Sequence, residues 1–155
     1  MSRKAAAVVE AVKSYRSADG SPRFVRDVTT LSGYRNQYGA QTFIVDATLG
    51  CDLDAFKEYF AQEHDISMPS SCDGLFLWKD PQGNNDKATR LDRDYSGETL
   101  LFVEFKHAPI FKMANGRVDF LHAGQNGGVD GGCYEASIQK KLEDSCIILM
   151  HTTRS

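Results

Sequence analysis

Hydrophobic side chains gather in three short runs that are typical of β-strands. They cover residues 42–49 (TFIVDATL), 73–79 (DGLFLWK) and 100–107 (LLFVEFKH). Each run is rich in aliphatic or aromatic side chains and is bordered by Gly, Pro or polar residues. Weaker alternation predicts two further short strands, at residues 24–32 and 117–122.

The strand predicted at residues 100–107 combines an apolar sequence with two charged side chains near its end. Its side chains alternate between two faces, and one face carries Leu100, Phe102, Glu104 and Lys106. Both faces begin apolar, which indicates a central strand covered on each side. Buried charges are costly unless they are paired, hydrogen-bonded or holding a metal. The two charges at the end of this strand therefore need a structural or chemical reason.

Helical spacing of apolar residues appears in three other segments, at residues 2–16, 52–64 and 133–150. Asp52 is placed to cap the second of these helices. The mixture of helices and strands predicts one α/β domain over residues 1–155, a length that suits a single core.

Two polar stretches separate these elements. Residues 80–98 are expected to form a long hairpin loop between two strands. Residues 124–132 are rich in Gly but lack the Lys-Ser/Thr that follows a phosphate-binding loop, so they are interpreted as a connector.

The hairpin would bring a carboxylate next to the charged strand end. Glu104 and Lys106 are two residues apart on one face, about 7 Å from each other at their bases. If residues 73–79 pair with residues 100–107, Asp73 lies beside them. Two converging carboxylates suit a hard cation such as Mg²⁺, and an adjacent ammonium can orient water or stabilise an oxyanion. This combination predicts metal-assisted phosphodiester hydrolysis.

Simpler interpretations exist for the same residues. Glu104 and Lys106 could form an ordinary charge pair near a sheet edge. Glu58 and Glu63, on the helix before Asp73, could add a metal ligand or form a solvated face. Trp78 is expected in the core.

At this point the residues match a known family. CDGLFLW followed by LLFVEFKH resembles the PD-(D/E)xK nuclease superfamily, with Asp73 as the single Asp and Glu104-Phe105-Lys106 as the (D/E)xK element. The resemblance implies a restriction-endonuclease-like fold, in which helices flank a mixed central sheet. It implies that Asp73 and Glu104 hold Mg²⁺ or Mn²⁺ and that Lys106 assists the water and the scissile phosphate.

The resemblance extends to the last predicted helix. The segment SIQKKLEDSCIIL resembles the helix that carries further active-site residues in some bacterial members, and the matching positions are Gln139 and Lys141. The nuclease-like core would then span residues 52–155, with residues 1–51 as an N-terminal extension of unclear role. A bacterial or phage defence context follows from the resemblance alone.

The chain departs from the family pattern in two places. Cys72 stands where Pro often precedes the Asp. The family core also has a strand after the last helix, which this sequence does not clearly provide. Either residues 146–152 form that strand, or the fold is truncated, or a second copy or a protein partner completes it.

Composition and charge leave nucleic acid open as a partner. Hydrophobic residues make up 41% of the chain and charged residues 25%, which is ordinary for a soluble protein. The net charge is −3, but residues 1–40 hold seven Lys/Arg against three Asp/Glu, and the remainder eleven against eighteen. The basic and aromatic side chains of the N-terminal part could contact nucleic acid or form a solvated face. They are Lys13, Tyr15, Arg16, Arg23, Arg26, Tyr34, Arg35 and Tyr38.

Nothing in the sequence indicates export or membrane insertion. No secretory signal is visible, and the apolar run at residues 146–150 is too short to cross a bilayer. The four cysteines have no CxxC spacing, which favours reduced, partly buried thiols. We therefore expect a cytoplasmic protein.

Two functions from different classes remain. The first is a divalent-metal-dependent nuclease acting on DNA or RNA. The second is a catalytically inactive nuclease-like domain that binds nucleic acid or a protein partner and acts as a regulatory module.

Overall fold

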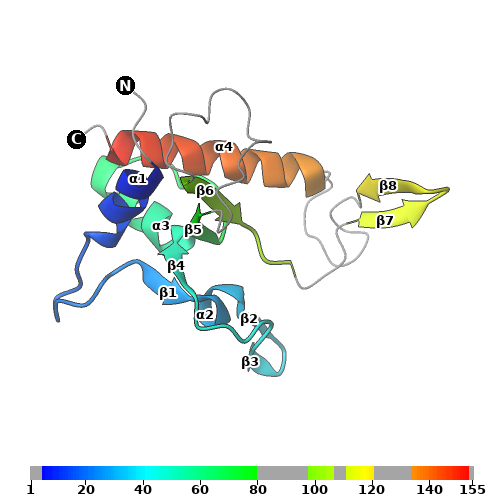
Figure 1. The fold of residues 1–155 in the computed structure, drawn as a ribbon, viewed down its shortest axis with the longest axis horizontal. Coiled ribbons are helices and arrows are strands. Elements are labelled where there is room, and N and C mark those ends of the chain that lie inside the picture. The colour runs from blue at the N-terminus through cyan, green and yellow to red at the C-terminus, as the bar shows by residue number, and fades with distance from the viewer. Residues whose placement is uncertain (1–4, 80–97, 107–110, 121–133, 154–155) are drawn as a thin grey trace.

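A computed structural model describes residues 5–79, 98–106, 111–120 and 134–153 (Figure 1). The helices are α1 (Ala5–Lys13), α2 (Val28–Ser32), α3 (Leu53–His64) and α4 (Tyr134–Thr152). The strands are β1 (Val25–Asp27), β2 (Tyr34–Asn36), β3 (Gly39–Gln41), β4 (Leu49–Asp52), β5 (Gly74–Lys79), β6 (Glu98–Val103), β7 (Phe111–Ala114) and β8 (Arg117–Phe120).

The main sheet has four strands in the order β1-β4-β5-β6, and each neighbouring pair is antiparallel. The predicted hairpin is confirmed, because β5 and β6 pair from Gly74↔Val103 to Lys79↔Glu98. The mixed sheet implied by the nuclease resemblance is not found in the described part of the chain. The fold is mixed α and β, and its sheet is antiparallel. The chain leaves the sheet at the end of β4, forms α3 and returns through residues 65–73 to the same end of the sheet, so β5 runs opposite to β4.

The core lies on one face of this sheet. Cys51, Leu75 and Phe102 form a row across β4, β5 and β6, and Cys51 and Leu75 are fully buried. Helices α1, α3 and α4 pack over this row; α4 spans the top of the view in Figure 1 with α1 and α3 near its C-terminal end. The buried helix residues that complete the core include Val9, Val12, Phe56, Phe60, Ile148 and Leu149.

The opposite face is covered only in part. A Cβ built on Gly50 would lie 2.4 Å from the Phe76 ring, and one on Gly74 would lie 2.8 Å from it, so Phe76 packs directly against this backbone. Trp78 is 46% exposed and Leu101 is 45% exposed. The predictions that Trp78 belongs to the core and that the strand at residues 100–107 is covered on both faces are wrong, because α1, α3 and α4 pack on the other face, over Cys51, Leu75 and Phe102.

The N-terminal part differs most from the sequence expectation. The strand predicted at residues 42–49 is wrong, since residues 42–48 have no regular structure and β4 begins only at Leu49. Asp46 instead contacts α2. Its backbone carbonyl accepts hydrogen bonds from the backbone N–H and from the hydroxyl of Thr29. Val45 is 84% exposed as a result.

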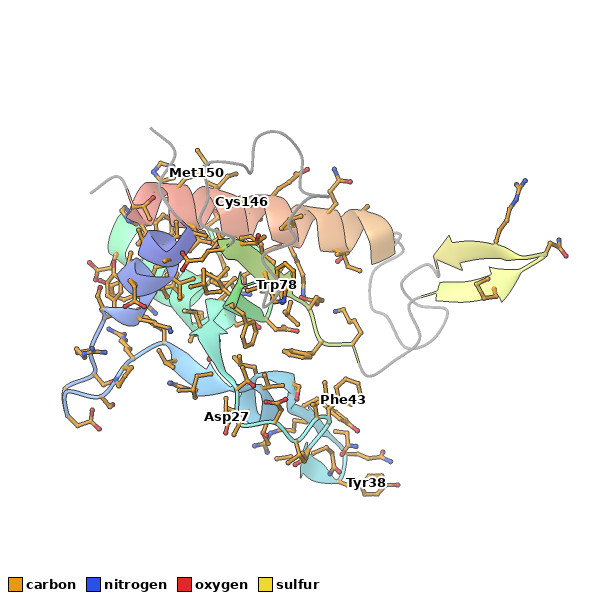
Figure 2. All side chains as sticks on the ribbon, viewed as in Figure 1. Asp27, Tyr38, Phe43, Trp78, Cys146 and Met150 are labelled. Atoms are coloured by element: carbon orange, nitrogen blue, oxygen red, sulfur yellow. The ribbon has the colours of Figure 1, made fainter. Side chains whose placement is uncertain are left out.

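The strand predicted at residues 24–32 is shorter than expected. It ends at Asp27, whose side chain caps α2 by accepting a hydrogen bond from the backbone N–H of Thr30 at 2.8 Å. The β2–β3 hairpin that follows was not predicted, and Tyr38 projects from its tip (Figure 2).

The C-terminal elements settle one open alternative. Helix α4 continues through Thr152, so residues 146–152 are not the family's final strand. The strand predicted at residues 117–122 overlaps β8, which pairs with β7 in a separate two-stranded sheet. The predicted connector at residues 124–132 and nearly all of the hairpin loop at 80–98 lie outside the described residues. None of the described helices has the length and apolarity that a membrane span requires.

Candidate active site

Asp73 and Glu104 meet at one end of the β5–β6 hairpin. Gly74 and Val103 form the last strand pair, and Asp73 directly precedes the first while Glu104 directly follows the second. The backbone N–H of Phe105 donates a hydrogen bond to Oδ2 of Asp73 at 2.6 Å. The predicted juxtaposition is therefore confirmed. One detail is corrected: β6 ends at Val103, so Glu104 and Lys106 lie just beyond the strand, where the backbone turns toward Asp73.

The side chain of Glu104 is only 9% exposed, less than those of Lys106 at 32% and Lys141 at 26%. Its Oε1 forms an ion pair with Nζ of Lys106 at 2.7 Å and accepts a hydrogen bond from Nζ of Lys141 at 2.5 Å. Its Oε2 is buried and has no hydrogen-bond partner among the described residues. A buried polar atom without a partner is costly, and such an atom in a native site calls for an explanation such as a bound ion.

The surroundings of Asp73 disfavour the charged form of its carboxyl group. Burial, together with the charges of Glu104 and Asp54, raises its pKa to about 6, although the Phe105 N–H and the charge of Lys141 act in the opposite direction. A cation bound beside this carboxylate would reverse the effect, because a bound divalent ion is the largest local charge in such a site.

Asp54 is a third carboxylate that the sequence interpretation missed. It lies in the first turn of α3, and its Oδ1 accepts hydrogen bonds from Nζ of Lys57 and from Oγ of Ser71, both at 2.7 Å. Burial would raise its pKa, but these two hydrogen bonds and the charges of Lys57 and Lys141 lower it overall.

The carboxylates first considered on this helix, Glu58 and Glu63, are both exposed. The sequence feature that could have identified Asp54 is the helix cap at Asp52. A helix that starts there places its first turn at the sheet end where β5 begins.

Of the two positions suggested on α4, the structure brings only Lys141 to the cluster. Burial would lower the pKa of Lys141, but its hydrogen bond to Glu104 and the charges of Glu104, Asp73 and Asp54 raise it. Gln139 is exposed, and its Nε2 donates to Oε1 of Glu143 at 3.0 Å. Two residues along a helix turn the side chain by about 200°, so Gln139 and Lys141 point to nearly opposite sides.

The segment that carries Asp73 is anchored between α3 and α4. The N–H of Ser70 donates to Oδ2 of Asp144 at 2.9 Å, and the N–H of Cys72 donates to Oγ of Ser145 at 3.0 Å. On the other side, the N–H of Leu53 donates to the carbonyl of Asp73 at 3.2 Å. Both helices therefore position this carboxylate. Burial raises the pKa of the Cys72 thiol, so Cys72 acts as a buried, free cysteine in this segment.

The cluster fits an ion that needs few protein ligands. Within the described ranges, no group of three or more His, Cys, Asp or Glu side chains is arranged to hold a metal ion. Mg²⁺ usually binds through one or two carboxylates and keeps several waters. Asp73 and Oε2 of Glu104 supply that type of donor set, with lysines beside them.

Comparison with protein-family models, with curated proteins and with solved structures finds no match to this chain. The resemblance to the PD-(D/E)xK nucleases therefore rests on the motif residues alone.

Proposed function

We propose that this protein hydrolyses phosphodiester bonds of DNA or RNA with the help of Mg²⁺ or Mn²⁺. The observation that carries the proposal is the buried Oε2 of Glu104, which has no partner among the described residues and lies beside a second carboxylate whose pKa is raised to about 6. Purely structural ion pairs normally satisfy both oxygens of a buried carboxylate.

Each residue of the cluster has a role in this proposal. Asp73 and Glu104 would hold the ion, which when bound supplies Lewis acidity and lowers the pKa of water. Lys106 is close enough to Glu104 to orient a water or contact a phosphate oxygen. Lys141 neutralises Glu104 from α4, and Asp54 holds Lys57 and Ser71 at the rim of the cluster.

The direct test is hydrolysis of labelled single- and double-stranded DNA and RNA with Mg²⁺ or Mn²⁺. Glu104→Gln and Lys106→Ala should each lower kcat/KM by about a hundredfold or more. Glu143→Gln and Lys140→Ala are matched controls on the exposed side of α4 and should change it less than about twofold. Unchanged hydrolysis in Glu104→Gln and Lys106→Ala would contradict the assigned roles.

A second candidate is a nuclease-like module that binds nucleic acid or a protein without cleaving it. It is favoured by the two ammonium groups that already contact Oε1 of Glu104, as they would in a structural ion-pair network. Calorimetric titration with Mg²⁺ and Mn²⁺ separates the two functions, because the module needs no metal. We also propose a cytoplasmic location, which suits the free cysteines Cys51 and Cys72.

A further inference from the structure

A polar concavity lies against the face of α3 that carries Ala55, Glu58, Tyr59 and Gln62. Its volume is about 380 Å³, within the range of roughly 300–1,000 Å³ that is usual for ligand sites. The polar side chains that line it are Ser17, Arg23, Arg26, Glu58, Tyr59 and Gln62. They come from the segment between α1 and α2 and from the outer face of α3.

Arg23 is held in place by aromatic rings. The central carbon of its guanidinium lies 4.8 Å from the ring centroid of Tyr59 and 5.2 Å from that of Phe24. Tyr59 is fixed in turn by an edge contact with the Tyr15 ring and a tilted contact with the Phe24 ring. A guanidinium stacked in this way loses little freedom when it binds a ligand.

The positive charge of Arg23 is available to a ligand. In the portion of the chain that is described, no carboxylate forms an ion pair with Arg23 or Arg26. Nη1 of Arg26 donates to the carbonyl of Val25 at 2.7 Å, and no described residue accepts a hydrogen bond from its other side-chain donors. Two guanidinium groups on one polar hollow match the geometry of a phosphate.

The concavity and the candidate active site share one helix. Glu58 lines the concavity and lies one turn after Asp54, which corresponds to a rise of about 6 Å. A chain that runs from the concavity toward the start of α3 would therefore reach Asp54, whose side chain is 48% exposed. A nucleic-acid strand has the repeated phosphates and flat bases that such a path requires.

We propose that this concavity is a binding subsite for a segment of a single nucleic-acid strand on its way to Asp73 and Glu104. Arg23 and Arg26 bind a phosphate, the exposed plane of the Arg23 guanidinium stacks on a base, and Gln62 hydrogen-bonds to a base edge. Glu58 opposes the phosphate and weakens the interaction. This assignment depends on the proposed function for its class of ligand.

The test measures binding without hydrolysis. A fluorescein-labelled twelve-nucleotide single strand is titrated with the full chain in EDTA, and anisotropy is followed at several salt concentrations. The double variant Arg23→Gln/Arg26→Gln should bind about tenfold more weakly. The magnitude of its salt slope should fall by about 0.7, because the two arginines neutralise one phosphate and each neutralised phosphate on a single strand contributes about 0.7.

A matched double variant controls for net charge. Arg117→Gln/Lys140→Gln removes the same charge from exposed positions on β8 and α4, and its affinity should stay within twofold of the unaltered protein. Equal losses in both double variants would overturn the subsite, since they would show only general attraction to a cation-rich surface.

A variant that should bind more tightly tests the subsite even if the arginine double variant does not fold. Glu58→Gln removes the opposing charge and should tighten binding about threefold, which a folding defect cannot mimic. No change in affinity would contradict the subsite. A polyglutamate peptide of equal charge should compete poorly; equal competition would overturn the assignment to nucleic acid.

The subsite and the proposed function can fail separately. If Arg23- and Arg26-dependent binding is found but no metal-dependent hydrolysis, the catalytic proposal fails and the subsite stands. If the protein cleaves nucleic acid and Arg23→Gln/Arg26→Gln leaves kcat/KM unchanged, the subsite fails and the catalytic proposal stands.

Discussion

The N–H of Phe105 donates a 2.6 Å hydrogen bond to Oδ2 of Asp73, which joins two residues 32 positions apart. Phe105 lies between Glu104 and Lys106, so this single bond brings the whole Glu104–Lys106 segment against the Asp73 carboxylate. The bond also lowers the pKa of Asp73 against the larger effect of burial. The candidate-site cluster is therefore assembled by the backbone as well as by side-chain charge.

The raised pKa of Asp73 predicts that its negative charge destabilises the fold. The pKa is about 6 in the folded protein and near 3.8 in an unfolded chain, so the folded state binds more protons between these values. The contribution of Asp73 to stability is thus favourable below about pH 4 and is lost as the pH rises through 6. Because the carboxyl is partly exposed, solvent screening limits the cost to roughly 1–2 kcal/mol.

Asp73→Asn should accordingly stabilise the protein at pH 7.5 by roughly 1–2 kcal/mol in the absence of metal. Its amide oxygen can still accept the Phe105 N–H, so the local geometry is kept. Urea unfolding at pH 7.5 and pH 4 measures the effect, and the difference between the two proteins should vanish at pH 4. A destabilised Asp73→Asn at pH 7.5 would show that Asp73 is already neutralised by its neighbours.

Divalent metal should stabilise the folded protein in a pH-dependent way. Mg²⁺ or Mn²⁺ at about a hundred times its dissociation constant should add about 2.7 kcal/mol at pH 7.5. The gain should be smaller at pH 5, because protons compete for Asp73. Thermal unfolding with and without metal checks this, and Glu104→Gln should remove most of the gain. A shift equally large in Glu104→Gln would place the metal elsewhere.

Lys141 and its neighbour Lys140 should differ in their effect on stability. Lys141→Met removes one of the two cations from the buried Glu104 and should cost roughly 1–3 kcal/mol. Lys140→Met breaks only an exposed pair with Asp144 and should cost no more than about 0.5 kcal/mol. Denaturant unfolding of the two variants side by side gives the comparison. Equal costs would mean that Glu104 is not held by α4.

The packing of Phe76 on glycine predicts a substitution that the sheet does not tolerate. Gly50→Ala places a methyl group 2.4 Å from the Phe76 ring and should destabilise the protein by roughly 1–3 kcal/mol. Adding Phe76→Leu should recover part of this loss, because the smaller side chain leaves room for the methyl group. Thermal unfolding of the single and double variants measures the recovery; no recovery would place the strain in the backbone instead.

Strong local patterns in the sequence identified the elements around the candidate site. The alternation in residues 73–79 and 100–107 and the polar stretch between them were enough to predict the β5–β6 hairpin and the meeting of Asp73 with Glu104. The run at residues 42–49 looked equally strand-like, but it has no strand partner because the backbone of Asp46 bonds to Thr29 in α2. Pairing depends on what lies alongside a segment, and its own sequence does not specify that.

The places of Lys141 and Asp54 in the candidate site also depend on tertiary packing. The sequence suggested Lys141 and Gln139 equally as site residues. They lie on different sides of α4, and only Lys141 contacts Glu104, while Gln139 contacts Glu143. Asp54 carried no motif and entered the cluster because α3 starts at the sheet end beside Asp73.

The sequence by itself determined which residues form the hairpin and which charges end it, because periodicity and turn composition are local properties of the chain. Tertiary structure alone decided that β1 and β4 join the hairpin as antiparallel strands, that one face of the sheet is only partly covered, and that Asp54 and Lys141 join Asp73 and Glu104. These features depend on how α3 and α4 pack against the sheet. Such packing is set by many weak contacts between segments far apart in the chain.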